Sequence, residues 1–328
     1  MTRRIKMINV LVMSPCTDDD KDFLRSAGSC FSFYFAGKET DNDKLKEEID
    51  KAEIIIGEPE ISMIADAPNL KLIQMTMAGT DQYTRAEGFP RHVMLANASG
   101  AFGGVISQYV IGAILNIYHK FYLYRDNQKK NLWQDMGVET SLTGRRVLIV
   151  GAGNIGSSVA RRLSVFDTVT VGIRRKVNDI PPFFSEMHSL DELDSQLPLA
   201  DAVVCCIPNS DYTYHLFDKS KFMLMKKDAI FVNVGRGSLV VQEDLVDVLK
   251  SGHLKGAVLD VTDPEPLPPN SSLWGIENVI ITPHISGKSF GHSKEISDSI
   301  YHICAENLKN YSAGMPIKNL IDFSKFKK

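Results

Sequence analysis

Three side chains that could perform acid–base and anion chemistry follow predicted strands in the second half of the chain. Arg236 lies between two glycines, Glu265 lies between two prolines, and His284 follows a proline. In an open α/β sheet, ligands bind beyond the carboxyl ends of the strands. Reduction of a carbonyl group by hydride needs a proton donor, a cation for a substrate carboxylate and a group that keeps the donor protonated. An imidazole, a guanidinium and a carboxylate could supply these three functions.

Each of these residues also has an ordinary alternative when it is taken singly. Arg236 could be a surface arginine, Glu265 a loop acid, and His284 a histidine that is hydrogen-bonded in a domain seam. The hypothesis of a shared site therefore depends on a binding site for a hydride carrier elsewhere in the same sheet.

A glycine-rich turn predicts that carrier site. The apolar run 147–150 is typical of a buried strand. The glycines that follow it have the spacing G-x-G-x-x-G: Gly151, Gly153 and Gly156. The first would make the tight turn, the second would let a pyrophosphate approach the backbone, and the third would let helix and strand pack closely. Asn154 and Ile155 begin a helix whose free N–H groups suit phosphates, and this strand–turn–helix context favours a dinucleotide site over an ordinary glycine-rich turn.

The next predicted strand, residues 168–173, ends in Arg174 and Arg175. A carboxylate at this point would hold the adenosine ribose hydroxyls of NAD and repel a 2′-phosphate, whereas a guanidinium can bind that phosphate bidentately. The arginines therefore favour NADP(H) as the cofactor, with NAD(H) possible. Two solvated surface arginines are the alternative.

Composition limits the class of protein. The 328 residues suit two domains, and a net charge of −3 gives no reason to expect nucleic acid or an anionic membrane as a partner. Five cysteines without framework spacing indicate reduced packing residues of a cytoplasmic protein, so neither disulfides nor a metal site is expected. No segment approaches transmembrane length, and the N-terminus lacks the apolar core of a signal peptide.

Strands that alternate with helices predict an α/β fold with parallel sheets covered on both faces. The strands expected in a first domain are residues 5–13, 31–35, 54–57, 70–76 and 93–96. Six strands, the number in a full doubly wound dinucleotide fold, are expected in a second domain: residues 147–150, 168–173, 202–207, 230–234, 257–261 and 279–282.

Two helices would connect these domains. A helix over residues 105–121 would lead into the second domain, and a final helix from Ser289 would return to complete the first. The first domain is therefore expected to comprise residues 1–104 and 289–328, and the dinucleotide-binding domain residues 105–288. The active cleft would lie between them.

Several motifs, in this order along nearly the whole chain, resemble the D-isomer-specific 2-hydroxyacid dehydrogenase family. They are residues 77–81, 151–156, 232–237, 260–266, 282–287 and 307–308. That family includes glyoxylate/hydroxypyruvate reductases, phosphoglycerate dehydrogenase and D-lactate dehydrogenase. The resemblance implies a Rossmann doubly wound parallel sheet inserted in a smaller flavodoxin-like α/β substrate domain.

The resemblance also implies roles for individual residues. Arg236 would bind the substrate carboxylate and help polarise the carbonyl, and His284 would be the acid/base. Glu265 would pair with the other ring nitrogen of that histidine and favour imidazolium. Backbone N–H groups around Ala78 and Gly79 would hold the substrate carboxylate from the opposite domain.

The cofactor contacts implied by the resemblance lie after other strands. The resemblance implies that Asp260 contacts the nicotinamide carboxamide and that Pro208 and Val234 line the cofactor site. Arg174 stands where the family usually has an acid. This departure resembles the reductase branch of the family. Glu265 argues against a formate dehydrogenase, which resembles this fold but uses glutamine there.

The activity implied is hydride transfer from NADPH to C2 of a 2-oxoacid, which gives a D-2-hydroxyacid. Glyoxylate or hydroxypyruvate is favoured as the substrate, while branched and aromatic oxoacids stay open. The substrate pocket is expected near Met75, Met77, Tyr83 and Trp274. A non-catalytic dinucleotide sensor or corepressor-like protein is the alternative, although such a protein would not need the arginine, the glutamate or the histidine.

Trp133 lies in a polar stretch between the long helix and the glycine-rich unit. In the resembling reductases this region is a dimer arm, so a homodimer is expected, with Trp133 near its interface. A surface-packed tryptophan is the alternative.

Overall fold

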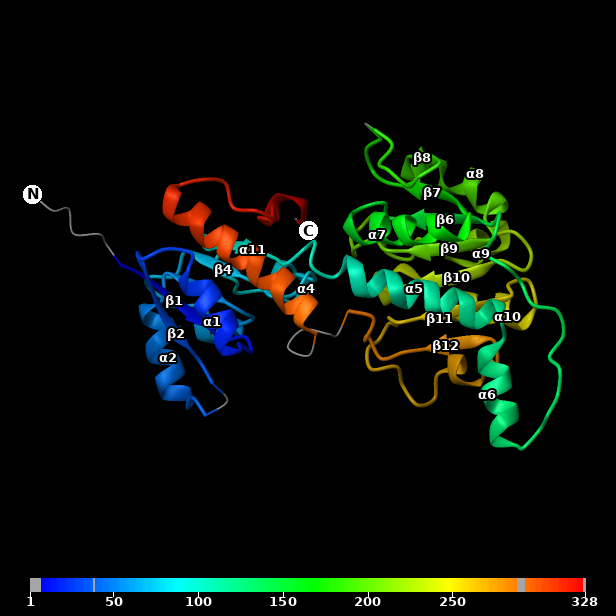
Figure 1. Ribbon diagram of the computed structural model, residues 1–328, viewed down its shortest axis with the longest axis horizontal. Coiled ribbons are helices and arrows are strands. Elements are labelled where there is room, and N and C mark those ends of the chain that lie inside the picture. The colour runs from blue at the N-terminus through cyan, green and yellow to red at the C-terminus, as the bar shows by residue number, and fades with distance from the viewer. Residues whose placement is uncertain (1–6, 38, 178, 288–292, 327–328) are drawn as a thin grey trace, which may run out of the picture. The chain divides into compact units, whose positions relative to one another are not determined.

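A computed structural model describes residues 7–37, 39–177, 179–287 and 293–326. The chain forms two compact units (Figure 1). Unit 1 comprises Met1–Phe102 and Ser289–Lys328, and unit 2 comprises Gly103–Lys288. Unit 2 is thus inserted in the sequence of unit 1, and each unit is built on one parallel sheet.

Unit 1 has a five-stranded sheet. Its strands are β1 (Ile8–Val12), β2 (Phe31–Phe35), β3 (Ile54–Ile56), β4 (Leu72–Gln74) and β5 (Met94–Ala96). They pair in the order β2-β1-β3-β4-β5, and every pair is parallel. This is the order of flavodoxin-like sheets, so the expected fold class of this part of the chain is confirmed.

Helices cover this sheet, and the first two begin at residues whose side chains accept backbone N–H groups. They are α1 (Asp18–Arg25), α2 (Asn42–Lys51), α3 (Ile61–Ile64), α4 (Asp81–Thr84) and α11 (Lys294–Ala313), with a final 3₁₀ turn, η6 (Phe323–Phe326). Thr17 and Asp20 form a capping box at α1, and Asp41 accepts the N–H of Lys44 at α2.

The final helix belongs to unit 1 because its apolar face and one polar side chain fit the sheet there. Ile296 and Ile300 are buried, and so is Asn307, whose amide donates to Gln74 Oε1 at 2.6 Å. This helix was expected from Ser289, but its first described residue is Lys294, after the N-cap Ser293. Residues 289–292, where this helix was expected to begin, lie outside the described residues.

The described residues of unit 2 form seven strands rather than the six expected. They are β6 (Arg146–Val150), β7 (Val169–Ile173), β8 (Glu186–His188), β9 (Ala202–Cys205), β10 (Ile230–Asn233), β11 (Gly256–Leu259) and β12 (Val279–Ile281). The sheet order β12-β11-β10-β9-β6-β7-β8 is that of a doubly wound fold. Strand β8 was not predicted, because this edge strand is short and only Met187 in it is buried, which leaves no apolar run.

The long helix of unit 2 also differs from expectation. It ends at Tyr118 and a separate helix follows, α5 (Gly103–Tyr118) and α6 (Phe121–Lys129). Lys120 between them has a φ of 56°, a left-handed conformation that ends the first helix. The apolar spacing continues through Phe121, so periodicity alone did not reveal this break.

The remaining helices of unit 2 cover its sheet, and α5 packs against the helix that follows the glycine-rich turn (Figure 1). They are α7 (Asn154–Leu163), α8 (Leu193–Gln196), α9 (Lys219–Leu224) and α10 (Gln242–Lys250). Short 3₁₀ turns connect them: η1 (Ser164–Phe166), η2 (Leu190–Glu192), η3 (Leu197–Leu199), η4 (Gly237–Leu239) and η5 (Ser272–Gly275).

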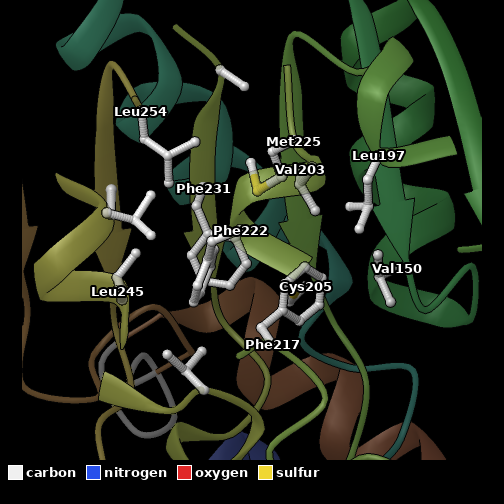
Figure 2. Close-up of a cluster of buried hydrophobic side chains, with 14 of the residues drawn as sticks. Val150, Leu197, Val203, Cys205, Phe217, Phe222, Met225, Phe231, Leu245 and Leu254 are labelled. Atoms are coloured by element: carbon white, nitrogen blue, oxygen red, sulfur yellow. The ribbon is translucent and has the colours of Figure 1, made fainter. Parts of the chain in front are cut away.

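One face of the unit 2 sheet packs on an aromatic cluster. The rings of Phe217, Phe222 and Phe231 lie with centroids 5.0 to 5.7 Å apart (Figure 2).

Cys205 is fully buried in the same core, and burial raises the pKa of the Cys206 thiol to about 12. All five cysteines are free thiols. Nothing in the described stretches forms a helix that could traverse a bilayer.

Candidate active site

The carboxyl ends of the unit 2 strands form one aligned row. The paired residues at those ends are Val150 with Cys205, Cys205 with Asn233, Asn233 with Leu259, and Leu259 with Ile281. Because the strands are parallel, the residues that follow them emerge at one edge of the sheet. Most of the predicted site residues follow these strand ends within a few positions: the glycine turn 151–156, Pro208, Val234, Arg236, Asp260, Glu265 and His284.

The glycine-rich turn has the geometry that its glycines predicted. Gly151 has a φ of +105°, and a Cβ there would lie 2.7 Å from Ile207 Cγ2. A Cβ at Gly156 would lie 2.3 Å from the carbonyl oxygen of Gly151, so the helix can approach the strand only without a side chain. A Cβ at Gly153 would meet open space, which leaves room beside the backbone for a ligand.

These features fit a pyrophosphate at the N-terminus of α7. The N-cap residue is Gly153, which has no side chain to occupy the first N–H groups of the helix. The backbone N–H groups of Asn154, Ile155 and Gly156 in the first turn therefore suit phosphate oxygens. The residues present fit a dinucleotide at this position.

Arg174 and Arg175 follow the end of β7, the strand next to the glycine turn. The Arg174 guanidinium donates to the backbone oxygen of Asp179 at 2.6 Å and to its carboxylate. Its Nε is buried and has no acceptor among the residues that the structure describes. Arg175 is exposed.

The turn that carries Arg236 is built by the buried side chain of Asn233. The amide of Asn233 accepts the N–H of Gly235 at 3.0 Å and donates to the carbonyl of Arg236 at 2.8 Å. Gly237 then packs so closely on the next loop that a Cβ would lie 1.9 Å from the Thr262 oxygen. The Arg236 turn and the loop that begins after β11 are thus fixed to each other.

Pro208 and Val234 flank the same edge of the sheet. Pro208 is exposed after β9, and its carbonyl accepts the Thr213 hydroxyl at 2.9 Å. Val234 is buried and donates its N–H to Cys205 at 3.1 Å.

Asp260 is a buried connection point between the strand ends. Its Oδ1 accepts the Thr282 hydroxyl at 2.7 Å and the N–H of Ile285 at 2.8 Å, while its Oδ2 accepts the N–H of Ser286 at 3.0 Å. Its carbonyl accepts the N–H of His284 at 2.8 Å. Asp260 was expected at the nicotinamide carboxamide. In the structure its two carboxylate oxygens hold the histidine turn.

Glu265 and His284 are in direct contact. The distance from Glu265 Oε2 to His284 Nδ1 is 2.9 Å, and Glu265 Oε1 accepts the N–H of Thr262 at 3.2 Å. The side chains of the histidine and the glutamate are 51% and 40% exposed, so the pair is accessible within unit 2. The histidine backbone has a φ of 54°, a left-handed conformation that the hydrogen bonds to Asp260 maintain. The structure thus brings two of the three proposed catalytic residues together.

Tyr109 and Thr282 are two residues that sequence reasoning missed. The Tyr109 hydroxyl on α5 lies 2.6 Å from Thr282 Oγ1, which in turn donates to Asp260. Burial raises the pKa of Tyr109 to about 12, so its hydroxyl stays a neutral hydrogen-bonding group. Tyr109 lies within the helix expected over residues 105–121, and its spacing contains no signal of this contact.

Ala78 and Gly79 lie in unit 1, in the loop between β4 and α4. The carbonyl of Ala78 accepts the amide of Asn97 at 2.6 Å. Within the described part of the chain, the N–H groups of Ala78 and Gly79 have no acceptor. Both residues are half-buried, so these N–H groups suit an anionic ligand.

The residues expected near a substrate pocket divide into two groups. Met75 and Tyr83 are at most 1% exposed and belong to the core of unit 1, so neither side chain is itself accessible to a ligand. Met77 is 53% exposed and Trp274 is 54% exposed, so only these two are accessible to a ligand. The apolar character of all four residues gave no means of separating core from surface.

Comparisons with known proteins agree with this architecture. The family model described as "D-isomer specific 2-hydroxyacid dehydrogenase, NAD binding domain" matches residues 111–286. The glyoxylate reductase of Thermofilum pendens is 32% identical over 249 residues, which cover 74% of this chain and 72% of that protein.

Solved structures extend the similarity to both units. A D-isomer-specific 2-hydroxyacid dehydrogenase family protein from Aeromonas salmonicida is 34% identical, with a TM-score of 0.85 over 97% of this chain and 99% of that chain. An NADPH-dependent glyoxylate/hydroxypyruvate reductase from Sinorhizobium meliloti, solved with NADP and sulfate, has a TM-score of 0.81. The alignment covers 98% of this chain and 100% of that chain, and at 22% identity it shows the shared fold alone.

The glycine turn, the aligned strand ends and the glutamate–histidine pair therefore occur in a chain whose sequence matches one family over more than half its length. This protein belongs to the D-isomer-specific 2-hydroxyacid dehydrogenase family.

Proposed function

We propose that the protein reduces a 2-oxoacid to a D-2-hydroxyacid with NADPH, and that Arg236, Glu265 and His284 are its catalytic residues. The observation that carries this proposal is the 2.9 Å contact between Glu265 Oε2 and His284 Nδ1 at the carboxyl edge of a dinucleotide-binding sheet. A carboxylate on one ring nitrogen orients an imidazole for proton transfer at the other.

The cofactor-binding residues proposed are those around the glycine turn and the ends of the neighbouring strands. Gly151, Gly153, Asn154, Ile155 and Gly156 would hold the pyrophosphate, while Arg174 and Arg175 would hold a 2′-phosphate. Pro208, Val234 and Asp260 would line the remainder. When bound, NADPH supplies the hydride that reduces C2 of the oxoacid. NAD(H) is a possible second cofactor, because the arginines favour a 2′-phosphate but do not prevent the binding of a dinucleotide that lacks it.

His284 would donate the proton that the reduced carbonyl oxygen needs. Its Nδ1 faces Glu265, so Nε2 is the nitrogen that can give a proton to the developing alkoxide. Glu265 is itself fixed by the N–H of Thr262, so the pair has a defined orientation.

Arg236 would bind the substrate carboxylate and help polarise the carbonyl. Its Nη1 donates to the Gly235 carbonyl at 2.7 Å, which orients one end of the guanidinium. The backbone N–H groups of Ala78 and Gly79 would hold the same carboxylate. In this proposal the substrate domain comprises residues 1–104 and 289–328, and unit 1, which ends its first segment at Phe102, nearly coincides with it.

Glyoxylate or hydroxypyruvate is the substrate that this reading favours. The arginines at the end of β7 favour NADPH, and a relative that is 32% identical is a glyoxylate reductase. A non-catalytic dinucleotide sensor is the second class of function. The maintained contact between Glu265 and His284 disfavours it, because a sensor has no use for an oriented proton donor.

We also propose a cytoplasmic homodimer. No residue of α6 is buried, and this helix extends away from the sheet of unit 2 (Figure 1). Large apolar side chains are exposed on it and on the segment after it: Phe121 57%, Leu132 49%, Trp133 105% and Val138 90%. Such a concentration of exposed apolar side chains is typical of a surface that another chain covers.

The histidine assignment predicts a large loss of rate when the imidazole is removed. His284→Ala should lower kcat/KM for glyoxylate by about 10²–10⁴, the usual contribution of a general acid. His302→Ala, which removes an exposed histidine of α11, is the matched control and should leave kcat/KM near the wild-type value. NADPH oxidation with a panel of 2-oxoacids measures both. Wild-type turnover in His284→Ala would show that another group donates the proton, and no turnover by the wild type on any oxoacid would support a sensor.

The arginine assignment predicts the cofactor preference. The wild type should have a lower KM for NADPH than for NADH, and Arg174→Asp should raise the KM for NADPH by about tenfold to a hundredfold, the value of one or two charge-assisted hydrogen bonds. Arg161→Asp makes the same charge change on an exposed position of α7 and should alter neither KM. A wild type that prefers NADH would contradict the assignment.

If the protein is a dimer, sedimentation velocity at micromolar protein should show a species with twice the mass of the chain. Trp133→Asp should shift the distribution toward monomer, because it places a charge on an apolar interface. Tyr212→Asp alters a side chain that is also highly exposed, at 83%, and should leave the dimer intact. A monomeric wild type would end this part of the proposal.

A further inference from the structure

Glu58 is a half-buried acid at the end of β3 that no step of the proposed reaction uses. Its carboxylate accepts the N–H of Thr76 at 2.7 Å and the N–H of Met77 at 3.0 Å through the same oxygen, Oε1. The Thr76 hydroxyl lies 3.0 Å from Oε2. One side chain therefore binds the backbone immediately before Ala78 and Gly79.

The opposite side of this loop is held by the segment after β5. Ala98 donates its N–H to the carbonyl of Met77 at 2.9 Å, and the Asn97 amide donates to the carbonyl of Ala78 at 2.6 Å. Asn319 in turn donates to the carbonyl of Asn97 at 3.2 Å. The loop is therefore fixed by a carboxylate at one end and by an amide at the other.

These contacts determine where the free N–H groups point. The C=O and N–H of a trans peptide unit point in opposite directions. Because the Met77 carbonyl faces Ala98 and the Ala78 carbonyl faces Asn97, the N–H groups of Ala78 and Gly79 point away from these partners. Two adjacent N–H groups with no acceptor among the described residues form a concavity suited to a carboxylate.

We infer that Glu58 is a positioning residue for the substrate carboxylate, because it holds Thr76 and Met77 so that the N–H groups of Ala78 and Gly79 are presented together. This inference rests on the proposed function, in which those N–H groups bind the substrate. Glu58 itself touches no reacting atom in this account.

The choice of an acid at this position has a cost that a purely packing role would not require. Burial raises the pKa of the Glu58 carboxyl, while the hydrogen bonds from Thr76 and Met77 act in the opposite direction. Tyr83 of α4 and Cys304 of α11 are the titratable groups that interact with it, and both stay neutral because burial raises their pKa values. A glutamine would offer one acceptor oxygen in place of two, so only the carboxylate can accept all three donors.

Substitution of Glu58 separates this role from a general effect on folding. Glu58→Ala should raise the KM for glyoxylate and the Ki for oxamate, an unreactive mimic of a 2-oxoacid, by about tenfold to a hundredfold, the scale of a small misplacement of binding groups. The kcat and the Kd for NADPH should change by less than about threefold. The variant loses binding energy that the ground state and the transition state share, and such a loss raises KM without lowering kcat. Glu58→Gln should restore most of the KM, because one oxygen can still accept both N–H groups.

Glu53→Ala is the matched control, because Glu53 is a half-buried acid of the same unit whose carboxylate accepts the Tyr311 hydroxyl at 2.8 Å. It should lower stability without changing the KM for glyoxylate. A folded Glu58→Ala with the KM of the wild type, or a change in KM equal to that of Glu53→Ala, would overturn the inference. If Glu58→Ala does not fold, Glu58→Asp, which withdraws the carboxylate by one methylene, must raise the KM, and a wild-type KM there overturns it equally. A wild type that reduces no 2-oxoacid would instead refute the proposed function.

Discussion

The buried carboxylate of Asp260 is the interaction on which the unit 2 site depends. Asp260 follows β11 and is 1% exposed, and its two oxygens accept a hydroxyl and two backbone N–H groups from the segment after β12. Removal of an acceptor lowers the free energy of unfolding by about 1–3 kcal/mol for each buried donor that is left unsatisfied. The left-handed turn at His284 is therefore held by a neighbouring strand end in addition to the local hydrogen bond from its N–H to the Thr282 carbonyl. Glu265 in the adjoining loop then meets a histidine whose position is already determined.

Backbone groups supply the sites proposed for anions in both units, and side chains hold that backbone in place. The first turn of α7 presents N–H groups where a pyrophosphate would bind, and Gly156 is needed because a side chain there would meet the carbonyl of Gly151. In unit 1, Glu58 and Asn97 hold the loop whose N–H groups would meet the substrate carboxylate. Backbone donors of this kind bind anions without the conformational freedom of long cationic side chains. The guanidinium of Arg236 and the imidazole of His284 would then be left for polarising the carbonyl and moving the proton.

Much of this arrangement could be predicted from the sequence, because the relevant signals are local. Alternating apolar segments and turn residues located all five strands of unit 1, and the glycine spacing located the turn at Gly151. Long-range contacts left no comparable signal. The strand β8 lacks an apolar run, and the break at Lys120 lies inside continuous helical periodicity. The contacts of Tyr109 with Thr282 and of Glu58 with Thr76 join residues far apart in the chain, so neither spacing nor composition could reveal them.

The central claim is that Asp260 positions the proton donor, and it is tested most directly by kcat in Asp260→Asn at saturating NADPH. Asparagine keeps the size of the side chain but replaces one acceptor oxygen by an NH₂ group, which must then face a donor from the His284 turn. A folded Asp260→Asn should reduce glyoxylate with a kcat lower by about tenfold to a hundredfold, because the imidazole is displaced from its productive position. A folded variant with the kcat of the wild type would contradict the account.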